Sequence, residues 1–414
     1  MYLCTFYDIR CSFLVLFTTF NCEALEMMQV VRPFVNRQTA LKLAKDIFHI
    51  TVNESRSSSV KELNSPEARC FYVQGILPHA REQEFILKVC KFQDFRESEA
   101  IIDELNDVMV TVNNHGILCS VPQQTANGKL YEMKKLNTTR EVIHNNDKTH
   151  NNELQKSNLD CVVRLFSYIP GDNMRALSCN LDMFYHVGCF AAKIDKVLKD
   201  FHCPALQTRS NRWDINNLSM ATKVSKIITK PEHKKILHHI EDIFTCMVKP
   251  RLDTLPKQCI HADINETNLI FNDNVHHNHP TGLIDFDLAA FNCRVFEISA
   301  SAAYMMTMYV DDPLEAGVHV TAGYQINNPL TAEEMELLFY LIQARMYQSV
   351  CFGTLASQIF PQNSKYLLYT VHRAWKALEK ITNTSKSKFD DRLHQLCSTH
   401  LQRGAKTIKT IRRW

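Results

Sequence analysis

The segment HADINETN (261–268) holds side chains whose types and spacing could transfer a phosphoryl group. Such a transfer needs a carboxylate that orients the attacking hydroxyl and accepts its proton, and oxygen ligands that hold a divalent cation against the phosphates. The pattern H-x-D-x-x-x-x-N places a base, Asp263, and an amide ligand, Asn268, at the two ends of one loop. A second carboxylate, Asp285, follows in the apolar run GLIDF. We therefore predict Asp263 and His261 as catalytic residues, and Asn268 and Asp285 as ligands of a divalent cation.

Each of these residues also has a simpler interpretation. Asp263 and Asn268 could be turn residues that bond their own backbone, and Asp285 could belong to a structural ion pair. We favour the chemical interpretation because an apolar segment, 269–271, follows the loop at once. A buried strand also tends to exclude an aspartate such as Asp285.

A cation for the phosphates is expected from the first third of the chain. Lys88 in EFILKV is an ammonium within an apolar predicted strand, and the alternative is that it sits on an exposed sheet edge. An acid on the next predicted helix should orient this lysine. We choose Glu104, with Asp103 and Asp107 nearly as suitable.

The composition excludes several classes of protein. The 414 residues are 45% hydrophobic, enough to bury a core, and the net charge of +3 favours neither nucleic acid nor a membrane surface as a partner. The 10 glycines are spread too widely for a G-x-G-x-x-G or P-loop motif, so a nucleotide site must be built another way. The 15 cysteines include no C-x-x-C, and most are expected to be buried thiols.

The predicted elements divide the chain into two parts. The first part is rich in strands, and its last strand runs into Pro170-Gly171, a pair typical of a hinge. Beyond the hinge, apolar residues recur at helical spacing. We therefore predict an α+β fold with an uncertain extension at 1–30 and a basic tail at 404–414. Between them lie a nucleotide-binding first lobe at 31–168, with a disordered insertion at 137–158, and a second lobe at 169–403 with the catalytic loop and substrate site.

Individual elements follow from the same patterns. Thr331 and Glu334 form a capping-box signature at the start of one helix. Strands are predicted at 60–63, 70–75, 84–89, 116–121, 129–133, 161–169, 268–271 and 282–286, and helices at 37–50, 97–112, 184–201, 236–247, 296–309, 331–351, 364–381 and 390–403.

On these motifs the chain resembles the aminoglycoside phosphotransferase-like branch of the protein-kinase fold and, more narrowly, the hydroxylysine kinases. The resemblance lies in residues 85–89, 261–268 and 282–286, and in stretches such as VVRLFSYIPG and RVFEISASAAYMM. It extends over roughly residues 33 to 400. The resemblance implies a two-lobed fold with a small strand-rich N-terminal lobe and a larger, mostly helical C-terminal lobe.

The resemblance also implies roles for individual residues. Asp263 would be the base, Asn268 and Asp285 the Mg²⁺ ligands and Lys88 the lysine that pairs with phosphate. The backbone of Ser167 and Tyr168 would face the purine at the hinge.

The implied reaction is phosphorylation of 5-hydroxy-L-lysine with GTP as donor, in the cytoplasm. ATP as donor, an acceptor such as choline, homoserine or an aminoglycoside, and a nucleotide-binding pseudokinase remain alternatives. The sequence indicates no oligomeric state.

A small amino-acid substrate carries ammonium groups and a carboxylate, so the helical lobe should offer acids and at least one cation. Position near the loop makes Asp214, Asp287, Glu297 and Arg294 hypotheses for these contacts. Ala262 stands where relatives usually have glycine, a mild change if its φ is negative.

Overall fold

The computed structural model describes residues 32–411 except 54, 64, 66–67, 79, 140–157, 273–277 and 360–363. The predicted extension at 1–30 lies outside these residues, as does most of the predicted insertion at 137–158. At both ends of that insertion the chain is regular, because one strand continues to Thr139 and the next begins at Asn158. The basic segment from 404 is not a separate tail up to 411, since the last helix runs through it.

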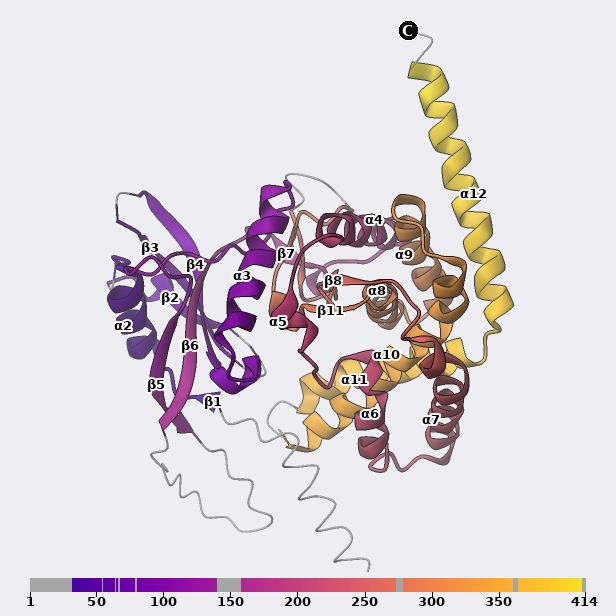
Figure 1. Cartoon of the computed structure of the whole chain (residues 1–414), viewed down its shortest axis with the longest axis horizontal. Coiled ribbons are helices and arrows are strands. Elements are labelled where there is room, and N and C mark those ends of the chain that lie inside the picture. The colour runs from indigo at the N-terminus through magenta and orange to yellow at the C-terminus, as the bar shows by residue number, and fades with distance from the viewer. Residues whose placement is uncertain are drawn as a thin grey trace, which may run out of the picture.

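One antiparallel sheet forms the first lobe (Figure 1). Its strands are β1 (Arg32–Pro33), β2 (Val60–Leu63), β3 (Arg69–Ile76), β4 (Glu82–Lys91), β5 (Glu132–Thr139) and β6 (Asn158–Ser167). Their order in the sheet is β1-β5-β6-β4-β3-β2. The register pairs Lys88 of β4 with Cys70 of β3 on one side and with Arg164 of β6 on the other. The predicted strand at 116–121 is wrong, because the β-pairing of that segment is limited to one isolated bridge, from Cys119 to Leu283.

Two helices cover the sheet. Helix α2 (Arg37–Phe48) begins where the side chain of Asn36 accepts the backbone N–H of Thr39, and its apolar face packs against the sheet in a core of its own. Helix α3 (Glu99–Asn114) lies between the sheet and the second lobe (Figure 1). Its buried face belongs to a core that continues through the second lobe, so α3 joins the two lobes.

The second lobe is mostly helical. Its helices are α4 (Leu181–Leu198), α5 (Pro204–Gln207), α6 (Leu218–Ser225), α7 (Pro231–Ile243), α8 (Val295–Met308), α9 (Pro313–Asn327), α10 (Ala332–Ile359), α11 (Ser364–Thr382) and α12 (Lys386–Ile411). The predicted capping box is confirmed, since Thr331 and Glu334 bond each other's backbone N–H. Helix α9 was not predicted, because it is buried on almost every side and lacks an amphipathic period.

Short strands between α7 and α8 carry the catalytic loop. β8 (Lys257–Ile260) pairs with β11 (Ala290–Cys293), while β9 (Leu269–Phe271) lies between β10 (Gly282–Leu283) and β7 (Asp172–Asn173). All of these pairs are antiparallel. The sequence predicted a strand at 282–286 with Asp285 inside it. β10 ends at Leu283, so Asp285 instead follows the strand. The loop from β8 to β9 therefore faces the turn that carries Asp285.

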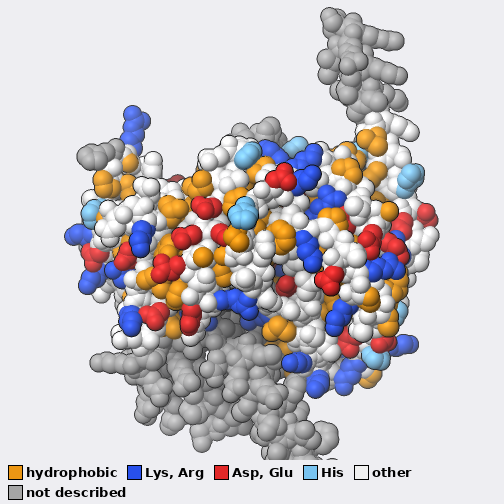
Figure 2. All heavy atoms as spheres, viewed as in Figure 1, with side chains coloured by type: hydrophobic (Ala, Val, Ile, Leu, Met, Phe, Trp, Pro, Cys, Tyr) orange, Lys and Arg blue, Asp and Glu red, His pale blue; other side chains and the backbone are white. Residues whose placement is uncertain are grey.

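The surface mixes charges of both signs. On the face in Figure 2, basic and acidic side chains are interspersed over both lobes. Every cysteine in the described part of the chain is a free thiol, and most are buried, as predicted. None of the helices within residues 32–411 combines the length and apolar character needed to cross a bilayer.

Helices α4 and α9 approach so closely that glycine is required at the contact. A Cβ on Gly188 would lie 1.8 Å from the carbonyl oxygen of Val320, and one on Gly323 would lie 1.9 Å from that of Tyr185. Gly188→Ala should therefore lower the free energy of unfolding by about 1–3 kcal/mol, although alanine favours helix. Denaturant unfolding measures this loss. The control is Lys193→Ala on the exposed side of α4, and equal stability of the two variants would contradict the packing argument.

Candidate active site

A strained turn opens the catalytic loop. Ala262 follows β8 with a φ of +65°, in the left-handed region where a side chain is disfavoured. The condition of a negative φ is therefore not met, and alanine in place of the glycine that the resemblance implies is not a mild change. The backbone N–H of Ala262 donates to Oε2 of Glu297 at 2.9 Å, and Glu297 is fully buried. This bond from α8 holds the turn in its strained form.

His261 lies beneath the loop. Its ring has no exposed surface, and burial lowers its pKa to about 4, so the ring is neutral. Nδ1 accepts the backbone N–H of Asp263 at 3.2 Å, and Nε2 lies 3.3 Å from the carbonyl oxygen of Ile284. A fully buried ring cannot touch a substrate, so the predicted catalytic role of His261 is wrong. It positions Asp263 and the turn before Asp285.

The predicted base and amide ligand are in direct contact. Nδ2 of Asn268 donates to Oδ2 of Asp263 at 2.9 Å, and to the backbone oxygen of the same residue at 3.0 Å. Nδ2 of Asn265 also donates to Oδ2 of Asp263, at 2.9 Å. The loop therefore closes on itself through the two side chains that the pattern singled out. Asn268 keeps its amide oxygen for a ligand, since its nitrogen is committed to Asp263.

Arg345 of α10 reaches the same carboxylate and was missed from the sequence. Its Nη2 lies 3.3 Å from Oδ1 of Asp263, while Nη1 donates to the carbonyl oxygen of Trp213 at 2.6 Å. Burial raises the pKa of Asp263 to about 7, and Arg345 opposes that rise. The signal for Arg345 was a charged residue within the apolar helix predicted at 331–351.

Lys88 lies at the centre of a charged cluster. Its Nζ is 2.7 Å from Oδ1 of Asp285 and 2.9 Å from Oδ2 of Asp287. Burial would lower the pKa of Lys88, but the two carboxylates raise it well above its ordinary value. Nη2 of Arg164, a fully buried residue, is 2.6 Å from Oδ1 of Asp287. The lysine is thus not on an exposed edge, and two strands of the sheet are bonded to the turn after β10.

The acid expected to orient Lys88 comes from elsewhere. Both carboxylate oxygens of Glu104 accept backbone N–H groups at the start of α5, at 2.8 Å from Ala205 and 2.9 Å from Leu206. Asp103 and Asp107, the other two choices, are on the exposed face of α3. The prediction of Glu104 as partner of Lys88 is therefore wrong, because the carboxylate caps a helix. The acid that orients Lys88 is Asp287.

The donor atoms around the loop suit a hard cation. Asp285 offers a carboxylate whose side chain is 46% exposed, and Asn268 offers an amide oxygen. Asp285 also raises the pKa of Asp263, so the two carboxylates lie near each other. Within residues 32–411, described with the gaps given above, no group of three or more His, Cys, Asp or Glu could by itself hold a metal. One carboxylate and one amide are the partial oxygen set with which Mg²⁺ is bound alongside phosphates.

The hinge residues already use their backbone donors. The N–H of Ser167 donates to Val121 at 2.9 Å, and that of Tyr168 donates to Glu84 at 3.1 Å. Only carbonyl oxygens of these two residues can therefore face a purine. The next N–H along the chain that could do so belongs to Ile169.

Three of the four predicted substrate contacts are engaged inside the protein. Glu297 is buried against Ala262, and Asp287 is paired with Lys88 and Arg164 as described above. Arg294 binds both oxygens of the buried Glu334, at 2.9 and 2.8 Å. These three predictions are wrong because each side chain joins two elements of the fold. Asp214 accepts the backbone N–H of Asn216 in its own turn at 2.9 Å, joins no second element through that bond and remains a hypothesis. It is partly buried, and burial raises its pKa.

Comparison with known sequences identifies the family. The model of the phosphotransferase enzyme family matches residues 76–334. Hydroxylysine kinase from Xenopus laevis is 25% identical over 366 residues, which cover 86% of this chain and 92% of that protein. Hydroxylysine kinase from Danio rerio is 24% identical over 376 residues, which cover 88% and 96%.

Solved structures show the same fold. Amicoumacin kinase, in complex with AMP-PNP, Ca²⁺ and Ami, has a TM-score of 0.55 at 16% identity and covers 86% of this chain and 97% of its own. A microcompartment-associated aminopropanol kinase has a TM-score of 0.54 at 17% identity and covers 83% and 95%. Fold and site together define a two-lobed, kinase-like phosphotransferase with a hydroxyl acceptor, as predicted. The chain belongs to the phosphotransferase enzyme family, within which it resembles the hydroxylysine kinases.

The strain at Ala262 predicts a stabilising substitution. Ala262→Gly should raise the free energy of unfolding by roughly 0.5–1 kcal/mol, because glycine adopts a positive φ without steric cost. Ala289 has a φ of −55°, so Ala289→Gly should lower that free energy by roughly the same amount. Denaturant unfolding compares the two variants. A loss of stability in both would show that the turn is unstrained.

The pair formed by Arg164 and Asp287 should stabilise the fold as a unit. Arg164→Met removes the fully buried cation of the pair, leaves the partly buried carboxylate of Asp287 without it and should cost about 3–5 kcal/mol of unfolding free energy. The double variant Arg164→Met/Asp287→Leu should cost clearly less than the sum of the two single variants. A double-mutant cycle by denaturant unfolding measures the difference. Additive losses would mean that the pair contributes no coupling.

Proposed function

We propose that the protein transfers the γ-phosphoryl group of a purine nucleoside triphosphate to the side-chain hydroxyl of 5-hydroxy-L-lysine, with GTP as donor, Mg²⁺ as cofactor and the cytoplasm as its location. The observation that carries the proposal is the contact of Asp263 with Asn268 beside Asp285 and Lys88. The acceptor follows from the hydroxylysine kinases that match most of the chain.

In this proposal Asp263 acts as the base. With a pKa near 7, its carboxylate can orient a hydroxyl and accept its proton near neutral pH. Arg345 and the amides of Asn265 and Asn268 fix its orientation. Lys88, held by Asp285 and Asp287, would pair its ammonium with the phosphates. Mg²⁺, held by Asn268 and Asp285, would neutralise charge on the transferred group.

The donor is a purine nucleotide on two grounds. Related structures contain AMP-PNP in one case and GDP with kanamycin in another. At the hinge, the carbonyl oxygens of Ser167 and Tyr168 and the N–H of Ile169 would face the purine edge, since the N–H groups of Ser167 and Tyr168 are already bonded. Because adenine and guanine both occur in this fold, the preference for GTP rests on the resemblance to hydroxylysine kinases.

A panel of acceptors tests the proposal. Purified protein is incubated with radiolabelled GTP or ATP and with 5-hydroxy-L-lysine, L-lysine, choline, homoserine or kanamycin. We expect label on hydroxylysine and none on L-lysine, which has no hydroxyl. If another amino alcohol is labelled in preference to hydroxylysine, that compound is the acceptor and the proposed acceptor is wrong. Nucleotide binding without labelling of any acceptor would support a pseudokinase.

Substitution of the base gives the sharpest single test. Asp263→Asn should lower kcat by about 10²–10⁴-fold while nucleotide affinity is retained, because only proton acceptance is removed. Asp160→Asn is the control, since that side chain is 59% exposed at the start of β6 and should leave kcat unchanged. Activity of Asp263→Asn close to that of the unmodified protein would exclude Asp263 as the base.

A further inference from the structure

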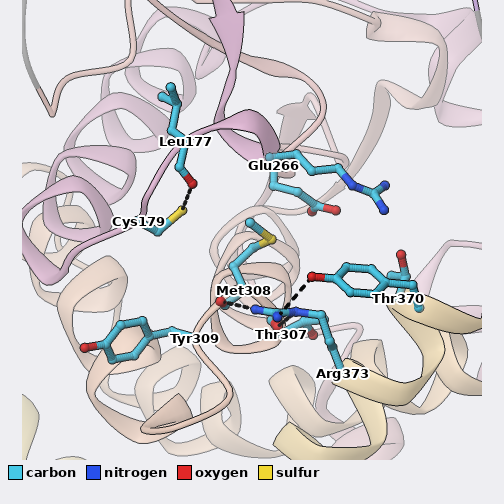
Figure 3. A pocket seen from close by; sticks show the side chains of 10 residues that line it. Leu177, Cys179, Glu266, Thr307, Met308, Tyr309, Thr370 and Arg373 are labelled. Carbon is cyan, nitrogen blue, oxygen red and sulfur yellow. Dashed lines mark hydrogen bonds between the residues drawn. The ribbon is translucent and has the colours of Figure 1, made fainter. Parts of the chain in front are cut away.

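A cavity of about 290 Å³ opens beside the catalytic loop (Figure 3). Its wall is built from four parts of the second lobe: the segment after the hinge, the catalytic loop, the end of α8 and helix α11. Arg175, Glu266 and Arg373 supply its charged groups, and Tyr309 and Tyr369 its aromatic groups. The volume lies at the lower end of the range for small-molecule sites, which favours a ligand the size of one amino acid.

The cavity is lined by a residue of the loop that carries the proposed base. Glu266 is the third residue after Asp263 in the same loop, and its carbonyl oxygen accepts the backbone N–H of Arg175 at 3.0 Å. The hydroxyl of Tyr304, which Arg345 contacts at 3.0 Å, lies within the electrostatic influence of both Asp263 and Glu266. A ligand that contacts Glu266 would therefore lie beside the loop that carries Asp263, the proposed proton acceptor.

The acid and one of the cations of the cavity approach from opposite sides. Glu266 is only 8% exposed, and its carboxylate points into the cavity from the loop (Figure 3). Arg373 enters from α11, where Nε donates to the carbonyl oxygen of Thr307 at 3.1 Å, Nη1 lies 3.3 Å from the hydroxyl of Tyr369 and Nη2 donates to Met308. A guanidinium has five N–H donors, so two remain after these three bonds.

A second guanidinium lies near the first. Arg175 and Arg373 are both placed over the ring of Tyr369, at 5.9 and 5.5 Å from its centroid. Both guanidinium groups also attract the carboxylate of Glu266. The cavity therefore presents two cations and one anion, which is complementary to a carboxylate next to an ammonium.

We infer that this cavity binds the α-amino-acid head group of the acceptor, with Glu266 paired to the α-ammonium and Arg373 and Arg175 to the α-carboxylate. The inference rests on the proposed function, because it concerns the acceptor of the same reaction. The remainder of the substrate then extends along the loop and brings its hydroxyl to Asp263. Binding of the head group forms and breaks no covalent bond. In the proposed transfer, the bond from the γ-phosphorus to the nucleoside diphosphate breaks, a phosphorus–oxygen bond to the acceptor forms, and the hydroxyl proton passes to Asp263.

The charge pattern separates amino acids from other amino alcohols. An acceptor without a carboxylate, such as choline or an aminoglycoside, would bury ammonium or apolar groups against two arginines and leave them uncompensated. An amino acid satisfies both signs. The cavity therefore accounts for selection of a zwitterionic acceptor within a fold that also serves other alcohols.

Matched acceptors test this assignment. The first is 5-hydroxy-L-lysine, the second is 2-hydroxypentane-1,5-diamine, which lacks the carboxylate, and the third is 6-amino-5-hydroxyhexanoic acid, which lacks the α-ammonium. Arg373→Gln should lower kcat/KM for hydroxylysine roughly 10- to 100-fold, and change that for the diamine by less than about 3-fold. Glu266→Gln should lower kcat/KM for hydroxylysine and the diamine, and leave that for the hydroxy acid nearly unchanged.

Controls separate binding from stability. Arg373 also bonds the end of α8, so thermal unfolding and nucleotide affinity are measured for every variant. Arg392→Gln is the matched control, because Arg392 bonds Glu315 of α9 at 2.8 Å and does not line the cavity. It should leave kcat/KM unchanged for all three acceptors. An equal loss for hydroxylysine and the diamine in Arg373→Gln would overturn the inference and leave the proposed function standing.

Binding provides a readout that does not depend on turnover. Isothermal titration with 5-hydroxy-L-lysine and with the diamine, in the presence of a non-hydrolysable GTP analogue, should show weaker binding of the diamine to the unmodified protein and equal binding to Arg373→Gln. If no acceptor is phosphorylated but this difference in binding is found, the proposed reaction fails and the head-group site stands. Equal binding of the two compounds to the unmodified protein, or no binding of either, would overturn the site.

Discussion

A largely buried cluster of opposite charges joins the sheet to the turn that carries Asp285. Lys88 and Arg164 project from paired positions of β4 and β6, and Asp287 bonds both of them. Because charges removed from water are costly unless paired, neither the strands nor the turn can shift without exposing an uncompensated group. The relative position of the two lobes and the orientation of Lys88 thus depend on the same contacts. Asp285 shares Lys88 with this cluster and is the member that remains half exposed.

The catalytic loop is held in a conformation that it would not adopt alone. Ala262 and Asp285 both have a positive φ, which is unfavourable for residues with side chains. Buried partners compensate: Glu297 accepts the N–H of Ala262, and His261 bridges the loop to the residue before Asp285. The backbone is strained on both sides of the site, and these buried hydrogen bonds keep Asp263 and Asp285 in position relative to each other. Burial of Glu297 and His261 is therefore part of the site, although neither can touch a substrate.

Much of the site could be predicted from residue types and spacing. Asp263, Asn268, Asp285 and Lys88 stand out because charged or amide side chains interrupt apolar runs, and the structure brings them together. Other predictions from the sequence were wrong for a physical reason. Glu104 lies on the correct helix, but its carboxylate finds two unpaired N–H groups at the start of α5, and sequence spacing does not reveal a helix end about a hundred positions away.

By itself the sequence determined two lobes, a strand-rich part before the hinge and a helical part after it, and a loop with the residue types for phosphoryl transfer. These follow from local periodicity and from side-chain chemistry, which neighbouring residues carry. Tertiary structure alone decided that Asp287 replaces Glu104, that Arg345 reaches Asp263 from 82 positions away, and that Glu266 meets Arg373 across a cavity. Such contacts depend on which helices and strands pack together, and that outcome is set by the shape of the whole core.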